Sequence, residues 1–258
     1  MKILKQIPNE LQNLKTVVEK LYYKGDISLL QRPKIAIVGS RRPIGYTKNI
    51  TFELSKKLSN AGICIVSGAA MGVDALSHQG AKSHNTIAVM GNGLNHKYPK
   101  INKNLIEKIE KNGLALSMFE PDFTATPWSF VVRNEIIVAL SQAVIIMQAD
   151  INSGSMRSAE FALKHNKPIY VLPHRLNESK GTNLLLKDGL ATAIYDIDEF
   201  VKQFDITIED NKIKTDEFYE FCKSFPRYED ALKLFGDRVF EEELDGNIVV
   251  KNGNIRLV

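Results

Sequence analysis

Short apolar runs that end at a glycine or a turn residue recur through the first 173 residues of the chain. The runs are 34–39, 63–68, 86–91, 114–117, 143–147 and 168–173. Continuous apolar runs of this length are typical of parallel strands that are covered on both faces. Segments with helical periodicity separate them, at about 46–61, 72–83, 101–112 and 131–141.

Strands that alternate with helices of ten or more residues predict an α/β fold. We expect an extended Rossmann-like, doubly wound and mostly parallel sheet over residues 33–204, with helices on both faces. Ligands bind outside the carboxyl ends of the strands in such sheets. The loops that follow the strands are therefore where a site is expected.

The two ends of the chain have different patterns. Residues 1–32 read as a short helical lead-in, because five apolar residues recur there at helical spacing. These five residues are Leu11, Leu14, Val17, Val18 and Leu21. Residues 205–215 are polar and charged and read as a linker. The pattern of 216–258 indicates three short helices and a hairpin that turns at Asn252-Gly253, which together predict a small winged-helix-like domain.

Charge is distributed unevenly along the 258 residues, whose net charge is +4. Residues 205–258 carry thirteen acidic and eight basic side chains, a net charge of −5, which leaves +9 on residues 1–204. The basic part is where a polyanion would bind, although +9 spread over so many residues also fits an ordinary solvated surface. Duplex DNA recognition by the acidic part is disfavoured, and a protein contact suits it better.

Two features bear on the compartment. Two cysteines are too few for a disulfide framework, so we expect a reducing cytoplasm. No apolar run approaches the roughly 20 residues that span a bilayer, so we expect a soluble protein without a membrane partner.

The turn Gly39-Ser40-Arg41-Arg42 follows the first buried run. Backbone N–H groups of such a turn, a serine hydroxyl and a guanidinium fork all suit a phosphate group. The dinucleotide fingerprint is absent, because Arg41 and Ile44 stand where its later glycines belong, and no P-loop pattern occurs. The sequence thus gives no support for NAD or for ATP hydrolysis, and we expect no cofactor.

Two more glycine turns follow later strands, at Ser67-Gly68 and at Ser153-Gly154-Ser155. Together the three turns predict a row of anion-binding concavities at one sheet edge. The alternative is that each glycine only permits a tight turn from strand to helix.

The segment 119–135 contains Phe130, Arg133 and Asn134. An aromatic ring beside an arginine is able to stack a base and hold its phosphate. Half-buried core packing is the alternative for Phe130. The five histidines have no metal-ligand spacing, and no nucleophile elbow occurs, so the residues indicate a binding protein without catalytic or metal sites.

Seven motifs together resemble the DNA processing protein A family, also called DprA or Smf. They are IAIVGSRR at 35–42, IVSGAAMGVD at 65–74, TIAVMGNG at 86–93, YPK at 98–100, RN at 133–134, SGS at 153–155 and GTN at 181–183. Their order and spacing match over about residues 20–200.

The resemblance implies a cytoplasmic, homodimeric protein of natural transformation. Such a protein binds incoming single-stranded DNA, shields it from nucleases and helps to load the RecA recombinase, with no enzymatic activity attached. The expected DNA-binding residues are Gly39, Ser40, Arg41, Arg42, Ser67, Gly68, Lys100, Phe130, Arg133, Asn134, Ser153, Gly154 and Ser155.

One departure from the family pattern concerns Glu135, which stands where an arginine is common. We expect it to lower the local affinity for phosphate, with Arg157 compensating. The turns also resemble, more distantly, lysine-decarboxylase-like (LOG) enzymes that hydrolyse nucleoside monophosphates. Here the third turn lacks their glycine cluster but keeps a following glutamate, Glu160. This enzyme is the alternative function.

Overall fold

The structure is a computed structural model that describes residues 1–12, 14–204, 217–244 and 246–257. The chain divides into two compact units, Met1–Ile206 and Thr207–Val258. The expected linker, 205–215, lies outside the described residues.

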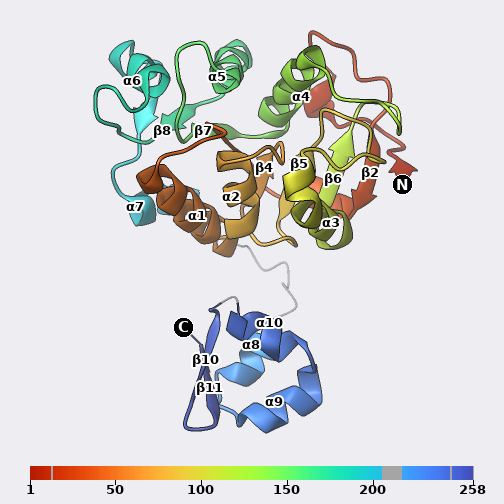
Figure 1. Cartoon of the computed structure of the whole chain (residues 1–258), viewed down its shortest axis with the longest axis vertical. Coiled ribbons are helices and arrows are strands. Elements are labelled where there is room, and N and C mark those ends of the chain that lie inside the picture. The colour runs from red at the N-terminus through yellow and green to blue at the C-terminus, as the bar shows by residue number, and fades with distance from the viewer. Residues whose placement is uncertain (13, 205–216, 245, 258) are drawn as a thin grey trace. The chain divides into compact units, whose positions relative to one another are not determined.

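A nine-stranded sheet forms the centre of the first unit (Figure 1). Its strands are β1 (Lys2–Ile3), β2 (Tyr22–Gly25), β3 (Lys34–Val38), β4 (Cys64–Ser67), β5 (Thr86–Val89), β6 (Leu114–Ser117), β7 (Ala143–Ile146), β8 (Ile169–Val171) and β9 (Thr192–Ala193). Their order across the sheet is β1-β2-β6-β5-β4-β3-β7-β8-β9. Strands β3 to β9 pair in parallel, whereas β1 and β2 pair antiparallel.

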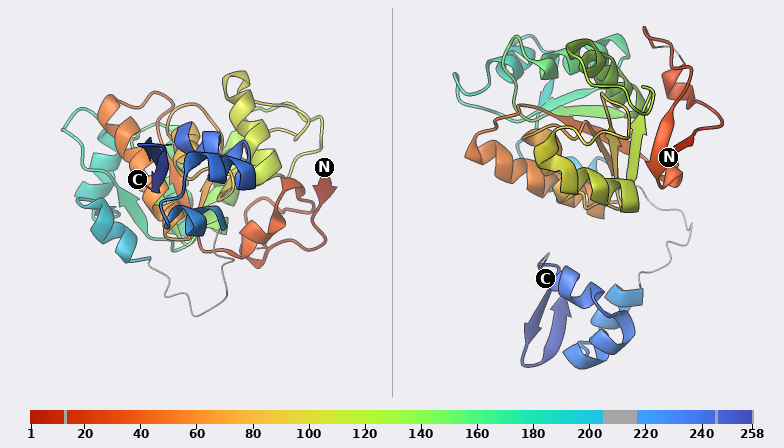
Figure 2. Two further views of the ribbon diagram at one scale, coloured as in Figure 1. Left: turned by 90° about the horizontal axis from the view of Figure 1, so that it is seen from below. Right: turned by 45° about the vertical axis from the view of Figure 1, so that its right-hand side comes forward.

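Helices cover both faces of this sheet. They are α1 (Gly45–Asn60), α2 (Val73–Gly80), α3 (Lys103–Asn112), α4 (Pro127–Leu140), α5 (Gly154–Lys164), α6 (Lys180–Lys187) and α7 (Ile197–Lys202). Figure 1 shows α1, α2 and α3 on one side of the sheet and α4 and α5 on the other, and Figure 2 gives two further views. The predicted doubly wound, mostly parallel architecture is confirmed.

Strand β3 shows why its sequence is apolar throughout. Ile35 and Ile37 belong to the core beneath α1, where Leu54 also lies, while Ala36 and Val38 belong to the opposite core beneath α4. Successive side chains of a strand point to opposite faces, so a strand between two helical layers has no polar side.

The order of the strands reverses beside β3. From β3 the chain proceeds through β4 and β5 to β6 in one direction, and β7, β8 and β9 then continue in the other. In open α/β sheets, ligands bind in the crevice at such a switch point, outside the carboxyl ends of the two strands. The turns after β3 and β7 flank that crevice here.

Helix α4 begins four residues before the predicted start at 131. Thr126 is its N-cap: the Ser129 N–H donates to Thr126 Oγ1 at 3.2 Å, and the Thr126 N–H donates to Ser129 Oγ at 2.9 Å. Pro127 occupies the first helical position, where its fixed φ suits the helix and its missing N–H has no cost. These capping residues bring Phe130 into the helix.

The predicted helical lead-in is wrong. No α-helix forms within residues 1–12 and 14–44, which contain the 3-10 helices Asn9–Leu11 and Ile27–Gln31 and the strands β1 and β2. Leu11 and Leu21 are buried beneath the sheet's α4 face, whereas Val17 is 72% exposed. The buried residues of this non-helical segment fall at helical spacing by coincidence. The segment leads into β2, which pairs with β6.

The second unit contains α8 (Glu217–Cys222), α9 (Tyr228–Phe235), α10 (Arg238–Leu244), β10 (Ile248–Lys251) and β11 (Asn254–Leu257). Three helices and a hairpin were predicted, and the structure has them. Asn252 and Gly253 both have positive φ, 53° and 77°, as a two-residue hairpin turn requires. Among the described residues of the whole chain, no helix is long and apolar enough to cross a membrane.

We expect Leu21→Ala to lower the free energy of unfolding of the first unit by about 3 kcal/mol, because it opens a cavity in the core. Val17→Ala, the matched control, removes an exposed side chain and should change it by less than about 0.5 kcal/mol. Urea unfolding measures both. Similar losses of unfolding free energy in the two variants would contradict the observed packing, because a helical lead-in would bury Leu21 and Val17 alike.

Candidate nucleic-acid interface

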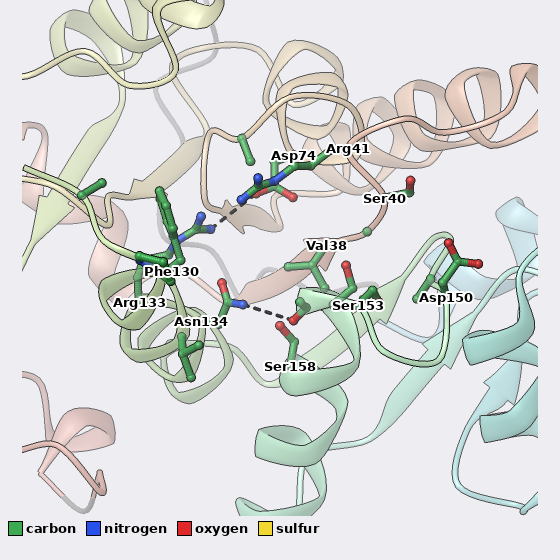
Figure 3. A pocket seen from close by; sticks show the side chains of 18 of the residues that line it. Val38, Ser40, Arg41, Asp74, Phe130, Arg133, Asn134, Asp150, Ser153 and Ser158 are labelled. Carbon is green, nitrogen blue, oxygen red and sulfur yellow. Dashed lines mark hydrogen bonds and ion pairs between the residues drawn. The ribbon is translucent and has the colours of Figure 1, made fainter.

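A pocket of about 700 Å³ opens at the switch point, between the turns that follow β3 and β7 (Figure 3). Its third wall is one face of α4. The lining residues are Val38, Gly39, Ser40, Arg41, Ala70, Asp74, Tyr98, Ala125, Thr126, Pro127, Phe130, Val131, Arg133, Asn134, Ala149, Asp150, Ser153, Gly154, Ser155 and Ser158. Nine of the thirteen expected DNA-binding residues therefore line one pocket, and they come from three separate segments of the chain.

The Gly39–Arg41 turn is hydrogen-bonded to the segment that follows β7. The Ser40 N–H donates to the Gln148 carbonyl at 2.8 Å, and Ser40 Oγ accepts the Arg42 N–H at 3.1 Å. The sequence predicted that backbone N–H groups of this turn bind an anion. Those of Ser40 and Arg42 instead donate hydrogen bonds within the protein. Arg41 is exposed and has no ion-pair partner among the described residues. Arg42 is exposed but does not line the pocket.

Phe130 is partly exposed and lies beside two guanidinium groups. Those of Arg41 and Arg133 are each 5.7 Å from the centre of its ring. Tyr98, 48% exposed, packs against the same ring with 5.9 Å between centroids. The ring also approaches Gly91 so closely that a Cβ there would lie 2.7 Å from Phe130 Cδ1. Aromatic surface beside a cation is suited to a nucleobase and its phosphate.

Arg133, which was expected to contact DNA, lines the pocket but is held there in a buried ion pair. It is 4% exposed, and its Nη1 lies 3.5 Å from Asp74 Oδ2. Burial raises the pKa of the Asp74 carboxyl and lowers the pKa of the Arg133 guanidinium, and the attraction between the two opposes both shifts. The pair is a fixed part of the pocket wall.

Ser67 and Gly68 were expected to contact DNA and have other roles. Ser67 is fully buried, and its hydroxyl donates to the Ile37 carbonyl at 2.6 Å. The Gly68 N–H donates to Asp74 Oδ2 at 3.2 Å. A Cβ on Gly68 would lie 1.2 Å from Arg133 Nη1, so this glycine makes room for the buried guanidinium.

The turn after β7 supplies hydroxyl groups. Ser153 is the N-cap of α5 yet makes no capping hydrogen bond with its side chain. Asn134, from α4, donates from Nδ2 to the Gly154 carbonyl at 3.3 Å and so joins two walls of the pocket. Ser153, Gly154 and Ser155 all line it, where the sequence placed them.

Two charged residues lie away from the pocket. Lys100 is exposed at the start of the 3-10 helix Lys100–Asn102, and Tyr98 lines the pocket instead. Glu135 is buried, and its Oε1 accepts from Lys164 Nζ at 3.1 Å and lies 3.2 Å from His165 Nε2. Because Glu135 points toward α5 and the lead-in, its expected effect on phosphate affinity has no structural basis.

Arg157, the expected compensating cation, pairs with Glu160 at 2.8 Å. Both side chains are exposed, and neither lines the pocket. The glutamate on which the resemblance to a nucleotide hydrolase depended is therefore outside the site.

Sequence reasoning missed Tyr98 and Ser158 as pocket residues, and it missed the pairing of Asp74 with Arg133. Tyr98 stands in a motif that was read for its lysine. Ser158 carries no signal of its own, because a serine one turn into a helix is ordinary. Among the described residues, no three His, Cys, Asp or Glu side chains gather as a metal ion would need.

Comparison with known proteins identifies the family. The family of the DNA recombination-mediator protein A matches residues 2–205. The chain belongs to this family. DNA processing protein DprA of Bacillus subtilis is 34% identical over 204 residues, 77% of this chain and 68% of that protein. The DprA of Streptococcus pneumoniae is 34% identical over 70% of this chain and 66% of its own length.

Solved structures of the family have the same fold. DNA processing protein A of Helicobacter pylori, described for its single-stranded DNA binding mode, is 45% identical with a TM-score of 0.77. The comparison covers 79% of this chain and 94% of that one. DprA of Streptococcus pneumoniae is 32% identical with a TM-score of 0.71. That comparison covers 76% of this chain and 70% of the other.

We expect Gly68→Ala to destabilise this member of the family by about 3 kcal/mol, since the new methyl group displaces Arg133 and leaves Asp74 buried without its partner. Gly45→Ala is the control, because a Cβ there meets nothing within 4 Å and Gly45 begins α1. Chemical denaturation compares the two. Equal stabilities would show that the buried pair tolerates displacement.

A pH dependence follows from His78, which is fully buried on α2 with Nδ1 2.6 Å from Thr86 Oγ1. Thr86 Oγ1 donates to the Ile65 carbonyl, so it accepts from a protonated Nδ1 of a neutral imidazole. Burial, and secondarily the Arg133 charge, lowers the pKa of His78 to about 3.

The folded state therefore keeps His78 neutral, while the unfolded chain protonates it near pH 6.5. Stability from this group is complete above about pH 6.5 and falls by about 1.4 kcal/mol for each pH unit below it. We expect the difference in unfolding free energy between the wild-type protein and His78→Gln to shrink at this rate from pH 6.5 to pH 5. A difference that stays constant over that range would contradict the assignment.

Proposed function

We propose that this chain binds single-stranded DNA in the pocket at the switch point, without performing chemistry on it. The observation that carries the proposal is the exposed Arg41 guanidinium above the Phe130 ring, inside a pocket of about 700 Å³. Arg41 contacts the phosphate backbone, and the faces of Phe130 and Tyr98 receive a base.

The arrangement suits a single strand better than a duplex. A base reaches an aromatic face inside a pocket only when it is unstacked, and single strands present such bases without the cost of opening a helix. Stacking accepts any base, so we infer binding without sequence preference. The relative from Helicobacter pylori, 45% identical, is described for binding single-stranded DNA, which supports the same ligand here.

Charge supports the assignment of the ligand to the first unit. Residues 1–204 carry a net charge of +9, whereas residues 205–258 carry −5. A polyanion is attracted to the first and repelled by the second.

The finer biological role rests on membership of the family. We infer that the protein acts in the cytoplasm during natural transformation, as a homodimer that protects incoming DNA and helps to load RecA. No cofactor enters this proposal. The enzymatic alternative has lost its supporting observation, because Glu160 is exposed and pairs with Arg157 outside the pocket.

Arg41→Ala tests the proposal. We expect it to weaken the affinity for a fluorescent oligothymidylate about tenfold, as it removes a charge-assisted contact. The slope of log affinity against log salt should also become shallower by about 0.7, the value for one phosphate of a single strand.

Arg42→Ala is the matched control, because Arg42 is the next residue, is exposed and does not line the pocket. It should retain the wild-type slope. If both variants bind as the wild-type protein does, or lose affinity equally, the pocket is not where the strand binds.

A further inference from the structure

Two hydroxyl groups in the pocket have no partner. Ser153 Oγ and Ser158 Oγ are buried, and neither has a hydrogen-bond partner among the described residues. Ser158 is fully buried, and both residues line the pocket. Figure 3 shows the two side chains on the α5 side, while Arg41 lies beside Asp74 on the other side.

Buried hydroxyls without partners are rare, because each has given up its water without a replacement. Other serines of this chain show the usual outcome: Ser55 Oγ donates to the Thr51 carbonyl at 2.7 Å, and Ser129 Oγ donates to the Gly91 carbonyl at 2.6 Å. A donor left open on a pocket wall is explained when a ligand supplies the acceptor.

The position of these hydroxyls specifies the ligand. They lie in the first turn and a half of α5, an eleven-residue helix with no acidic residue in its first turn. The N-terminus of a helix has a partial positive charge and favours anions. Hydroxyl donors at such a terminus suit the oxygens of a phosphate group.

We propose that Ser153, Ser158 and the first turn of α5 form a second phosphate-binding site, here called the α5 site, that acts through neutral donors. It rests on the proposed function, since the phosphate belongs to the strand whose neighbouring part Arg41 contacts. The exposed carboxylate of Asp150 also lines the pocket at the start of this turn, so the α5 site depends on hydrogen bonds and not on net charge.

The two sites should respond differently to salt. A cation such as Arg41 replaces counterions on the strand, and its loss changes the salt slope. A neutral hydroxyl replaces none, so its loss weakens binding by the same factor at every salt concentration.

Ser158→Ala is the test, because it removes one hydroxyl and leaves the packing. We expect the affinity for an oligothymidylate to fall about three- to tenfold, the effect of one neutral hydrogen bond, with the salt slope unchanged. The melting temperature without ligand should equal or exceed that of the wild-type protein, since an unbonded buried hydroxyl is removed. Ser55→Ala, which removes a bonded buried hydroxyl that does not line the pocket, should leave the affinity unchanged.

A mononucleotide separates the α5 site from the proposed function. Thymidine 5′-monophosphate should raise the melting temperature of the wild-type protein, and Ser158→Ala should reduce that shift. Thymidine, which lacks the phosphate, should give a smaller shift that Ser158→Ala does not change.

Four outcomes are informative. The α5 site alone would be overturned if Ser158→Ala kept the wild-type affinity for oligothymidylate and the wild-type melting shift with the monophosphate, while Arg41→Ala bound oligothymidylate weakly. A lower melting temperature without ligand would also overturn it, because the hydroxyl would then have a structural partner. A Ser158-dependent shift with the monophosphate, without any oligothymidylate binding, would uphold the site and overturn the proposed function. Binding of neither ligand would overturn both.

Discussion

Helix α4 carries much of the pocket, and its position depends on glycines where its side chains meet the sheet. Gly68 receives the Arg133 guanidinium, and Gly91 receives the Phe130 ring, at distances that a Cβ would prevent. Asp74, on α2, pairs with Arg133, on α4. The segment after β4, the segment after β5 and helix α4, which precedes β7, are thereby fixed together. Because both charges are buried and paired, this anchor needs no ligand to keep its shape, and it holds Phe130 in place within the protein itself.

Most of the sheet could be predicted from the sequence, because a strand between two helical layers must be apolar on both sides and such runs are conspicuous. The lead-in could not, since buried residues in an extended chain happened to fall at helical spacing, and only Val17 breaks the pattern by its exposure. The start of α4 was readable in principle from Thr126 and Pro127, which form a standard N-terminal cap.

The candidate site was predicted as a set of turns and not as an arrangement. Motif order located Arg41 and the serines at 153 and 155, and the pairing of an aromatic ring with an arginine located Phe130; all four line one pocket. The sequence could not show that Arg133 is buried against Asp74, or that Asn134 lines the pocket while Glu135 bonds to Lys164 outside it. Those facts depend on the direction in which each side chain leaves the helix and on how deeply it is buried. The identity of neighbouring residues in the sequence does not give either. Ser158 lies beyond sequence reasoning altogether, because its distinction is a missing partner.

The sheet has a further property at its margins. Its two outermost strands, β1 and β9, have two residues each. So short an edge offers few unpaired backbone groups, which limits the growth of the sheet by addition of another chain and guards against aggregation. A second copy of this protein therefore has little to gain from extending the sheet, and a homodimer would have to be built from complementary side-chain surfaces.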